Sequence, residues 1–167
     1  MSKQEKFGSI FPNEPNNKSE QNQDGYSPQE KEIVENIEKG AQGWRNIKQA
    51  QEIAENINDS YYKSQALSRI AQAQAQAGDI EGAKETFQQA QEIAENINDS
   101  YYKSQALSRI AQAQAQAGDI EGAKETAENI NNSDERSQAL SRIAQAQAQV
   151  GNIEGAKETA ENINDSL

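Results

Sequence analysis

The chain repeats itself, and this repetition limits what it can fold into. Residues 49–86 recur letter for letter as residues 89–126, and most of the same unit returns once more toward the C-terminal end of the sequence. A chain that copies one supersecondary unit builds a stack in which each copy buries its apolar face on its neighbours. The repetition therefore predicts an extended surface rather than one closed pocket.

The apolar spacing inside each unit predicts two helices. The second half carries apolar residues at steps of three and four, which place them on one helical face; they are Ile80, Ala83, Phe87, Ala90, Ala94 and Ile97. The first half alternates Ala and Gln over residues 71–77, which is the period of a strand. Because Ala and Gln favour helices and disfavour strands, we expect a helix over residues 61–77.

The residues between the two helices predict a tight turn. Gly78 can adopt the left-handed backbone conformation that ends a helix, and Asp79 can cap the next one. From Leu67 to Leu107 the unit has 40 residues, and from Leu107 to Leu140 it has 33. The seven lost residues are close to two helical turns, so the apolar stripe keeps its direction. The length change itself favours helices.

The same patterns divide the chain into a tail and a repeat domain. Residues 1–26 are polar, contain Pro12 and Pro15 and lack periodic apolar residues, so we expect a disordered N-terminal tail. Ser27, Pro28 and Glu30 match a capping box at the start of a helix. The repeat domain covers residues 27–167, with a degenerate first unit at 27–57 and repeats at about 60–97, 100–130 and 133–163.

Composition argues against several classes of function. The net charge is -11 and no basic patch is evident, so we expect neither nucleic acid nor an anionic membrane as a partner. The chain has no His and no Cys, which removes the usual zinc ligands and thiol chemistry. Ser60-x-x-Lys63 fits a nucleophile motif, but its companion motifs are absent and Ser60 is explained as a helix N-cap. We therefore predict a cytoplasmic protein that is not an enzyme and needs no cofactor or metal.

These residues resemble the tetratricopeptide repeat, a two-helix unit of 34 residues. Gly78-Asp79 occupies the turn of that unit, Ala83 its small residue, and Phe87 and Ala90 its aromatic and alanine positions. The likeness is partial. Gln74 replaces the aromatic residue of the first helix and Ala71 the usual glycine, while Ala127 and Ala160 replace the aromatic of the second helix in the later units. The resemblance implies an all-α, right-handed α-solenoid of stacked helix-turn-helix repeats; HEAT-like helical arrays are the alternative.

The resemblance also implies a binding groove along the first helix of each unit. Its amides and hydroxyls could hydrogen-bond the backbone of an extended peptide, although Gln is also an ordinary soluble helix former. The arginines Arg69, Arg109 and Arg142 lie one residue off this face and are expected to pair with glutamates on the second helices. The groove residues implied are Gln65, Ser68, Gln72, Gln76, Gln105, Ser108, Gln112, Gln116, Gln138, Ser141, Gln145 and Gln149.

The leading interpretation is a scaffold or adaptor that binds a protein or peptide partner in this groove. Tyr61, Tyr62, Tyr101 and Tyr102 begin two of the helices and are candidate contact anchors, because tyrosine buries a large area at low entropic cost. Packing on the preceding helix is the alternative. A rival function is self-assembly into a homo-oligomer, either a dimer, ring or filament, through the last helix. Its association face would consist of Ile153, Ala156, Ala160 and Ile163.

Overall fold

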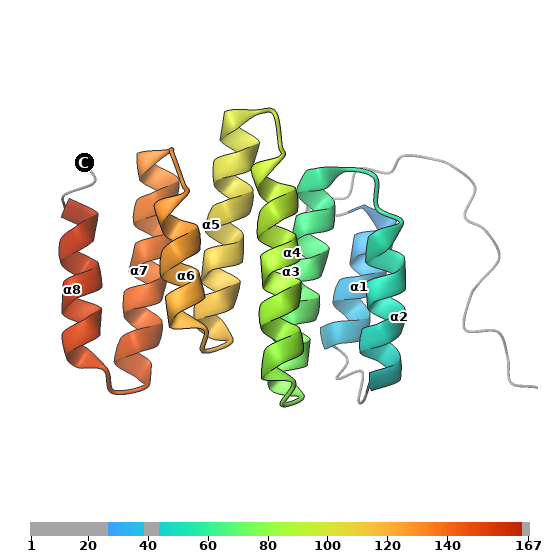
Figure 1. Ribbon diagram of the computed structural model, residues 1–167, viewed down its shortest axis with the longest axis horizontal. Coiled ribbons are helices and arrows are strands. Elements are labelled where there is room, and N and C mark those ends of the chain that lie inside the picture. Colours follow the sequence, from blue (N-terminus) through green and yellow to red (C-terminus); the bar gives the residue numbers. More distant parts are fainter. Residues whose placement is uncertain (1–26, 39–43, 165–167) are drawn as a thin grey trace, which may run out of the picture.

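The computed structural model describes residues 27–38 and 44–164, so the predicted tail lies outside the described residues. In this part of the chain every regular element is an α-helix, and consecutive helices form antiparallel pairs stacked side by side (Figure 1). We call the first helix of each pair the A helix and the second the B helix. The pairs are α1 (Pro28–Glu38) with α2 (Trp44–Glu55), α3 (Ser60–Gln76) with α4 (Ile80–Glu95), α5 (Ser100–Gln116) with α6 (Ile120–Glu128), and α7 (Ser133–Gln149) with α8 (Ile153–Asn164). The expected all-α repeat solenoid is confirmed.

Each of the last three pairs closes through the same turn. Gly78, Gly118 and Gly151 have φ angles of 88°, 87° and 82°, the left-handed region that an L-residue with a Cβ enters only with strain. The following N–H reaches back to the A helix, as in the 2.9 Å bond from the Asp79 N–H to the Gln74 carbonyl. These bonds define a Schellman turn. The predicted role of glycine is confirmed.

Aspartate and asparagine side chains cap the helices, both directly after these turns and at the start of α3. Asp79 accepts from the Gly82 N–H at 3.0 Å, and Asn152 accepts from the Gly155 N–H at 3.0 Å. At the start of α3 the N-cap is Asp59, whose carboxylate accepts from the Tyr62 N–H at 3.1 Å. The prediction that Ser60 is the cap was wrong. An aspartate at this position accepts with a full charge, so the serine becomes the first helical residue.

The shorter repeat, formed by α5 and α6, loses its residues from one helix. The A helices α3, α5 and α7 all have 17 residues, whereas α4 has 16 and α6 has 9. The difference of 16 − 9 = 7 residues is the predicted loss of two turns. Ile97 and Ile130, which follow these helices, are both buried. The apolar stripe therefore keeps its direction, as the sequence predicted.

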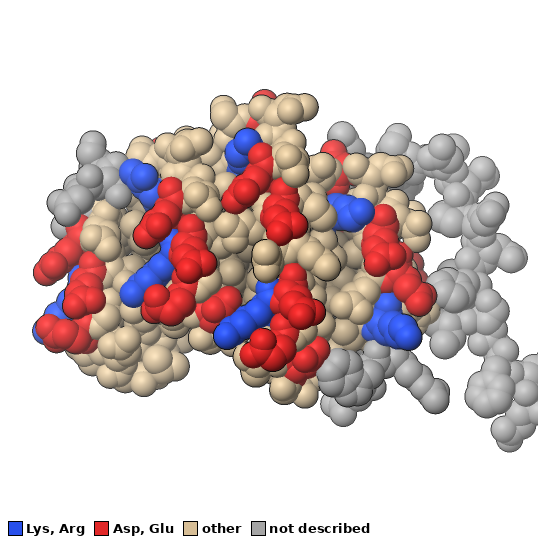
Figure 2. All heavy atoms as spheres, in the orientation of Figure 1, with Lys and Arg blue, Asp and Glu red and all other residues tan. Residues whose placement is uncertain are grey.

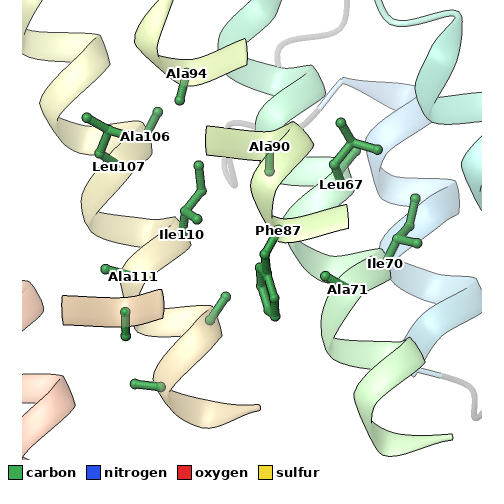
Figure 3. Packing of buried hydrophobic residues seen from close by; sticks show 14 of the residues in the cluster. Leu67, Ile70, Ala71, Phe87, Ala90, Ala94, Ala106, Leu107, Ile110 and Ala111 are labelled. Atoms are coloured by element: carbon green, nitrogen blue, oxygen red, sulfur yellow. The ribbon is translucent and has the colours of Figure 1, made fainter. Parts of the chain in front are cut away.

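A continuous core of small side chains runs along the stack. Phe87 of α4 is 1% exposed and points between α3 and α5, among Ala71, Ile110 and Ala111 (Figure 3). Alanines on both A helices let these helices approach closely. Ile80 departs from its predicted place, because it is 49% exposed. It is the first residue of α4, directly after the turn at Gly78 and Asp79.

A buried glutamine–threonine pair crosses each of the last two hairpins. Thr126 donates to Gln114 Oε1 at 2.7 Å, and Thr159 donates to Gln147 Oε1 at 2.7 Å. The first full hairpin lacks this bond: Thr86 donates to the Gly82 carbonyl at 2.9 Å, and Gln74 Oε1 is buried without a hydrogen-bond partner among the described residues. The sequence pattern missed these glutamines, since it placed only alanine and larger apolar residues on the buried face.

The predicted capping box at the start of α1 is confirmed. The Ser27 N–H donates to Glu30 Oε2 at 2.7 Å, and the Glu30 N–H donates to Ser27 Oγ at 3.2 Å. Glu30 is 3% exposed, and its Oε1 has no hydrogen-bond partner among the described residues. Burial raises the pKa of Glu30 above its ordinary value of 4.5, and the backbone hydrogen bond from Ser27 opposes only part of this rise.

This burial predicts that a neutral side chain is tolerated at position 30. Because the folded pKa exceeds the unfolded value, the unfolded chain loses its proton first, and stability falls as pH rises from 4.5 through the raised pKa. Glu30→Gln keeps an oxygen that accepts from Ser27 but cannot ionise. We expect the variant to be at least as stable as the wild type near neutral pH in urea denaturation. Its advantage should shrink below about pH 4, where the carboxyl is neutral. A wild type clearly more stable at neutral pH would contradict this account.

Candidate functional site, a polar groove on the A helices

The A helices border a polar hollow of about 400 Å³, which we call the A-helix groove. It is open to solvent and spans α3, α5 and the first turns of α7. Eight of the twelve predicted groove residues line it: Gln65, Ser68, Gln72, Gln105, Ser108, Gln112, Gln116 and Gln138. The other four, Gln76, Ser141, Gln145 and Gln149, are exposed on the A helices outside this hollow. The structure thus brings together the residues of three successive units.

Two glutamines of the groove accept hydrogen bonds from the neighbouring A helix. Gln72 Nε2 donates to Gln116 Oε1 at 2.8 Å, and the Tyr61 hydroxyl donates to Gln105 Oε1 at 2.7 Å. Such bonds hold neighbouring side chains in fixed rotamers. Less side-chain entropy is then lost when a ligand binds. The groove is therefore a partly preorganised surface rather than a row of independent amides.

Two cations also line the groove. Arg69 and Arg109 stand in its lining, so the expectation that they lie off this face was wrong. The reason is side-chain length, because an arginine carries its charge several bonds from the Cα that fixes its helical direction. Arg142, the equivalent residue of α7, donates to Gln145 Oε1 at 3.3 Å. It therefore contacts another of the predicted groove residues.

The four predicted tyrosine anchors form one aromatic row at the starts of α3 and α5. Adjacent rings meet edge to face, with centroids 5.3 Å apart for Tyr61 and Tyr62, 5.7 Å for Tyr61 and Tyr102, and 5.5 Å for Tyr101 and Tyr102. Tyr101 and Tyr102 are 55% and 51% exposed, while Tyr61 and Tyr62 are half-buried. The row borders a second hollow of about 570 Å³. A contact role for these tyrosines stays a prediction.

The predicted self-association face is only partly exposed. Ile153 is 52% exposed and Ala160 is exposed, whereas Ala156 is half-buried and Ile163 packs against the core. The nearby Val150 is 75% exposed. Self-assembly through this helix stays a prediction.

The described part of the chain lacks two kinds of feature. No helix there has the length and apolar character needed to cross a membrane. Within the same residues, no three His, Cys, Asp or Glu side chains come together in a way that could hold a metal ion.

The comparison with protein families agrees with this geometry. The family model described as Tetratricopeptide repeat matches residues 64–97, which run from the first turns of α3 to just beyond the end of α4. No curated protein and no solved structure matches the chain. Repeats of this family generally mediate protein–protein interaction. Residues 64–97 thus match a tetratricopeptide repeat, and the described chain resembles this family as an all-α solenoid of stacked helical hairpins.

Proposed function

We propose that this protein is a non-catalytic adaptor that binds an extended segment of a protein partner in the A-helix groove. The observation that carries the proposal is the shared hollow, to which three successive units contribute equivalent polar side chains. A surface that repeats along a stack suits a ligand that also repeats, and a peptide backbone is such a ligand.

The chemistry of the lining supports this kind of partner. A glutamine side chain offers both a donor and an acceptor, as each peptide unit does. Gln72 and Gln112 are half-exposed and Gln138 is exposed, so their amides are available to a ligand. The internal hydrogen bonds of the groove orient several of these groups before a partner arrives.

The proposal predicts that charge placed inside the groove displaces the natural partner. Gln72→Glu with Gln112→Glu introduces two carboxylates into the lining, and each replaces an amide that could donate to a partner carbonyl. We expect recovery of the specific partner to fall about ten-fold or more, the equivalent of losing one or two well-formed hydrogen bonds. The measurement is affinity capture from native lysate with quantitative mass spectrometry.

The matched control adds the same charge elsewhere. Gln88→Glu with Gln89→Glu alters two exposed residues of the B helix α4 and should leave recovery of the partner unchanged. Equal recovery of every captured protein with both variants would reject recognition in the A-helix groove.

A further inference from the structure

The A helices α3 and α5 differ in charge from the B helices that pack beside them. The A helices α3 and α5 contain Lys and Arg but no Asp or Glu. The B helices α4, α6 and α8 contain ten glutamates against three lysines, and columns of carboxylates follow these helices (Figure 2). In the three units from α3 to α8 the excess negative charge is thus concentrated on the B helices, and the lining of the A-helix groove has two arginines against one glutamate.

Within the groove, the cations recur at the same position of each unit. Arg69 and Arg109 line the hollow, and the equivalent Arg142 of α7 is exposed. The only carboxylate among the lining residues is Glu135 of α7. A guanidinium presents planar donors that match a carboxylate, and it stays charged at every physiological pH.

One buried donor strengthens the assignment. Gln65 is 7% exposed and lines the groove, and its Nε2 makes no hydrogen bond within the described residues. The Nε2 atom is itself enclosed, so a ligand oxygen would accept from it once the Gln65 side chain rotated toward the groove, and that bond would relieve the cost of an unpaired buried donor. Gln65 lies one turn from Arg69 on the same helix, where both could contact one acidic side chain.

We infer that the groove takes an acidic extended segment whose carboxylates lie on side chains along its length. This inference rests on the proposed function and names its partner class. Arginines repeated from unit to unit match charges distributed along a chain, whereas a single terminal carboxylate would engage one unit only. The acidic B helices also disfavour a bulky polyanion that would extend beyond the groove.

Fluorescence anisotropy with defined peptides tests the inference on the intact protein. The probe is a labelled peptide of six Glu-Ser repeats, with six Gln-Ser repeats as the matched neutral peptide. We expect the acidic peptide to bind about ten-fold more tightly or better, and added salt to weaken it because the contact is partly exposed. Amidation of its C-terminus should change the affinity little.

Paired variants locate the interaction. Arg69→Gln with Arg109→Gln should weaken acidic-peptide binding about ten-fold or more, whereas Lys84→Gln with Lys124→Gln removes the same charge from B helices and should have little effect. Since Arg69 also interacts with Glu30, Arg109→Gln alone serves as a variant that leaves α1 untouched and should give a smaller loss in the same direction.

Several results would overturn the inference. They are equal affinity for the neutral peptide, no binding of the acidic peptide, equal effects of the two variant pairs, or tighter binding of a single-stranded oligonucleotide of similar length. Equal affinity for the neutral peptide would leave the adaptor function in place with an uncharged partner. Failure of the adaptor function itself is detected separately, by the partner recovery described above.

Discussion

Phe87→Ala is expected to lower the free energy of unfolding by about 3–5 kcal/mol. Phe87 is 1% exposed and is the largest of the fully buried side chains. It lies between α3 and α5 among Ala71, Ile110 and Ala111, which are themselves packed in the core, so little side-chain volume is available to fill the vacated space (Figure 3). The loss therefore includes both the burial of the ring and the cavity it leaves.

Urea denaturation followed by circular dichroism measures this effect. Phe87→Leu should cost less than Phe87→Ala, because it keeps much of the apolar volume. Val150→Ala is the control and should change stability by less than about 0.5 kcal/mol, since Val150 is 75% exposed. A loss below about 1 kcal/mol for Phe87→Ala would show that α3 and α5 close over the gap. The later repeats already carry Ala127 and Ala160 at this position.

Thr159→Val is expected to cost about 1–3 kcal/mol, although it removes only one hydroxyl. The 2.7 Å bond from Thr159 is buried, and Gln147 is 1% exposed, so the substitution leaves Gln147 Oε1 in the interior without its donor. Substitution of the acceptor instead, Gln147→Leu, should cost less, because it leaves the Thr159 hydroxyl free to find another acceptor. Thr86 shows why, because its hydroxyl donates instead to the carbonyl four residues earlier.

The double variant separates the polar bond from the packing. Combining Gln147→Leu with Thr159→Val replaces both partners by apolar groups of similar shape, which should recover most of the loss of Thr159→Val. The four proteins form a double-mutant cycle measured by urea denaturation. Additive costs in the double variant would mean that the hydrogen bond contributes nothing and that the effect of each substitution is steric.

The helices and turns of this protein could be predicted because their causes are local. The left-handed Gly78, the capping Asp79 and the box formed by Ser27 and Glu30 each act within one turn of the chain. The loss of seven residues from the B helix was also predictable from the sequence, since it preserves the direction of the apolar stripe. Only the choice between Asp59 and Ser60 as N-cap was wrong, because both residues can accept the same hydrogen bond.

The groove was predictable in part. The helical repeat placed eight of the predicted polar residues in one hollow, because residues at equivalent positions of stacked helices share a face. It did not place Arg69 and Arg109 there. Helical periodicity gives the direction of a Cα–Cβ bond, and an arginine head can lie well away from that direction.

The sequence by itself determined the all-α repeat, its turns and the face along which its units stack, since these depend on spacing within each unit. Only the tertiary structure decided which polar residues became buried and which apolar ones stayed exposed. Gln114 and Gln147 are buried and accept from a threonine on the paired helix, and Gln74 is buried without that bond, whereas the apolar Ile80 is 49% exposed. Burial depends on which side chains the neighbouring helices enclose, and helical periodicity within one helix does not give this.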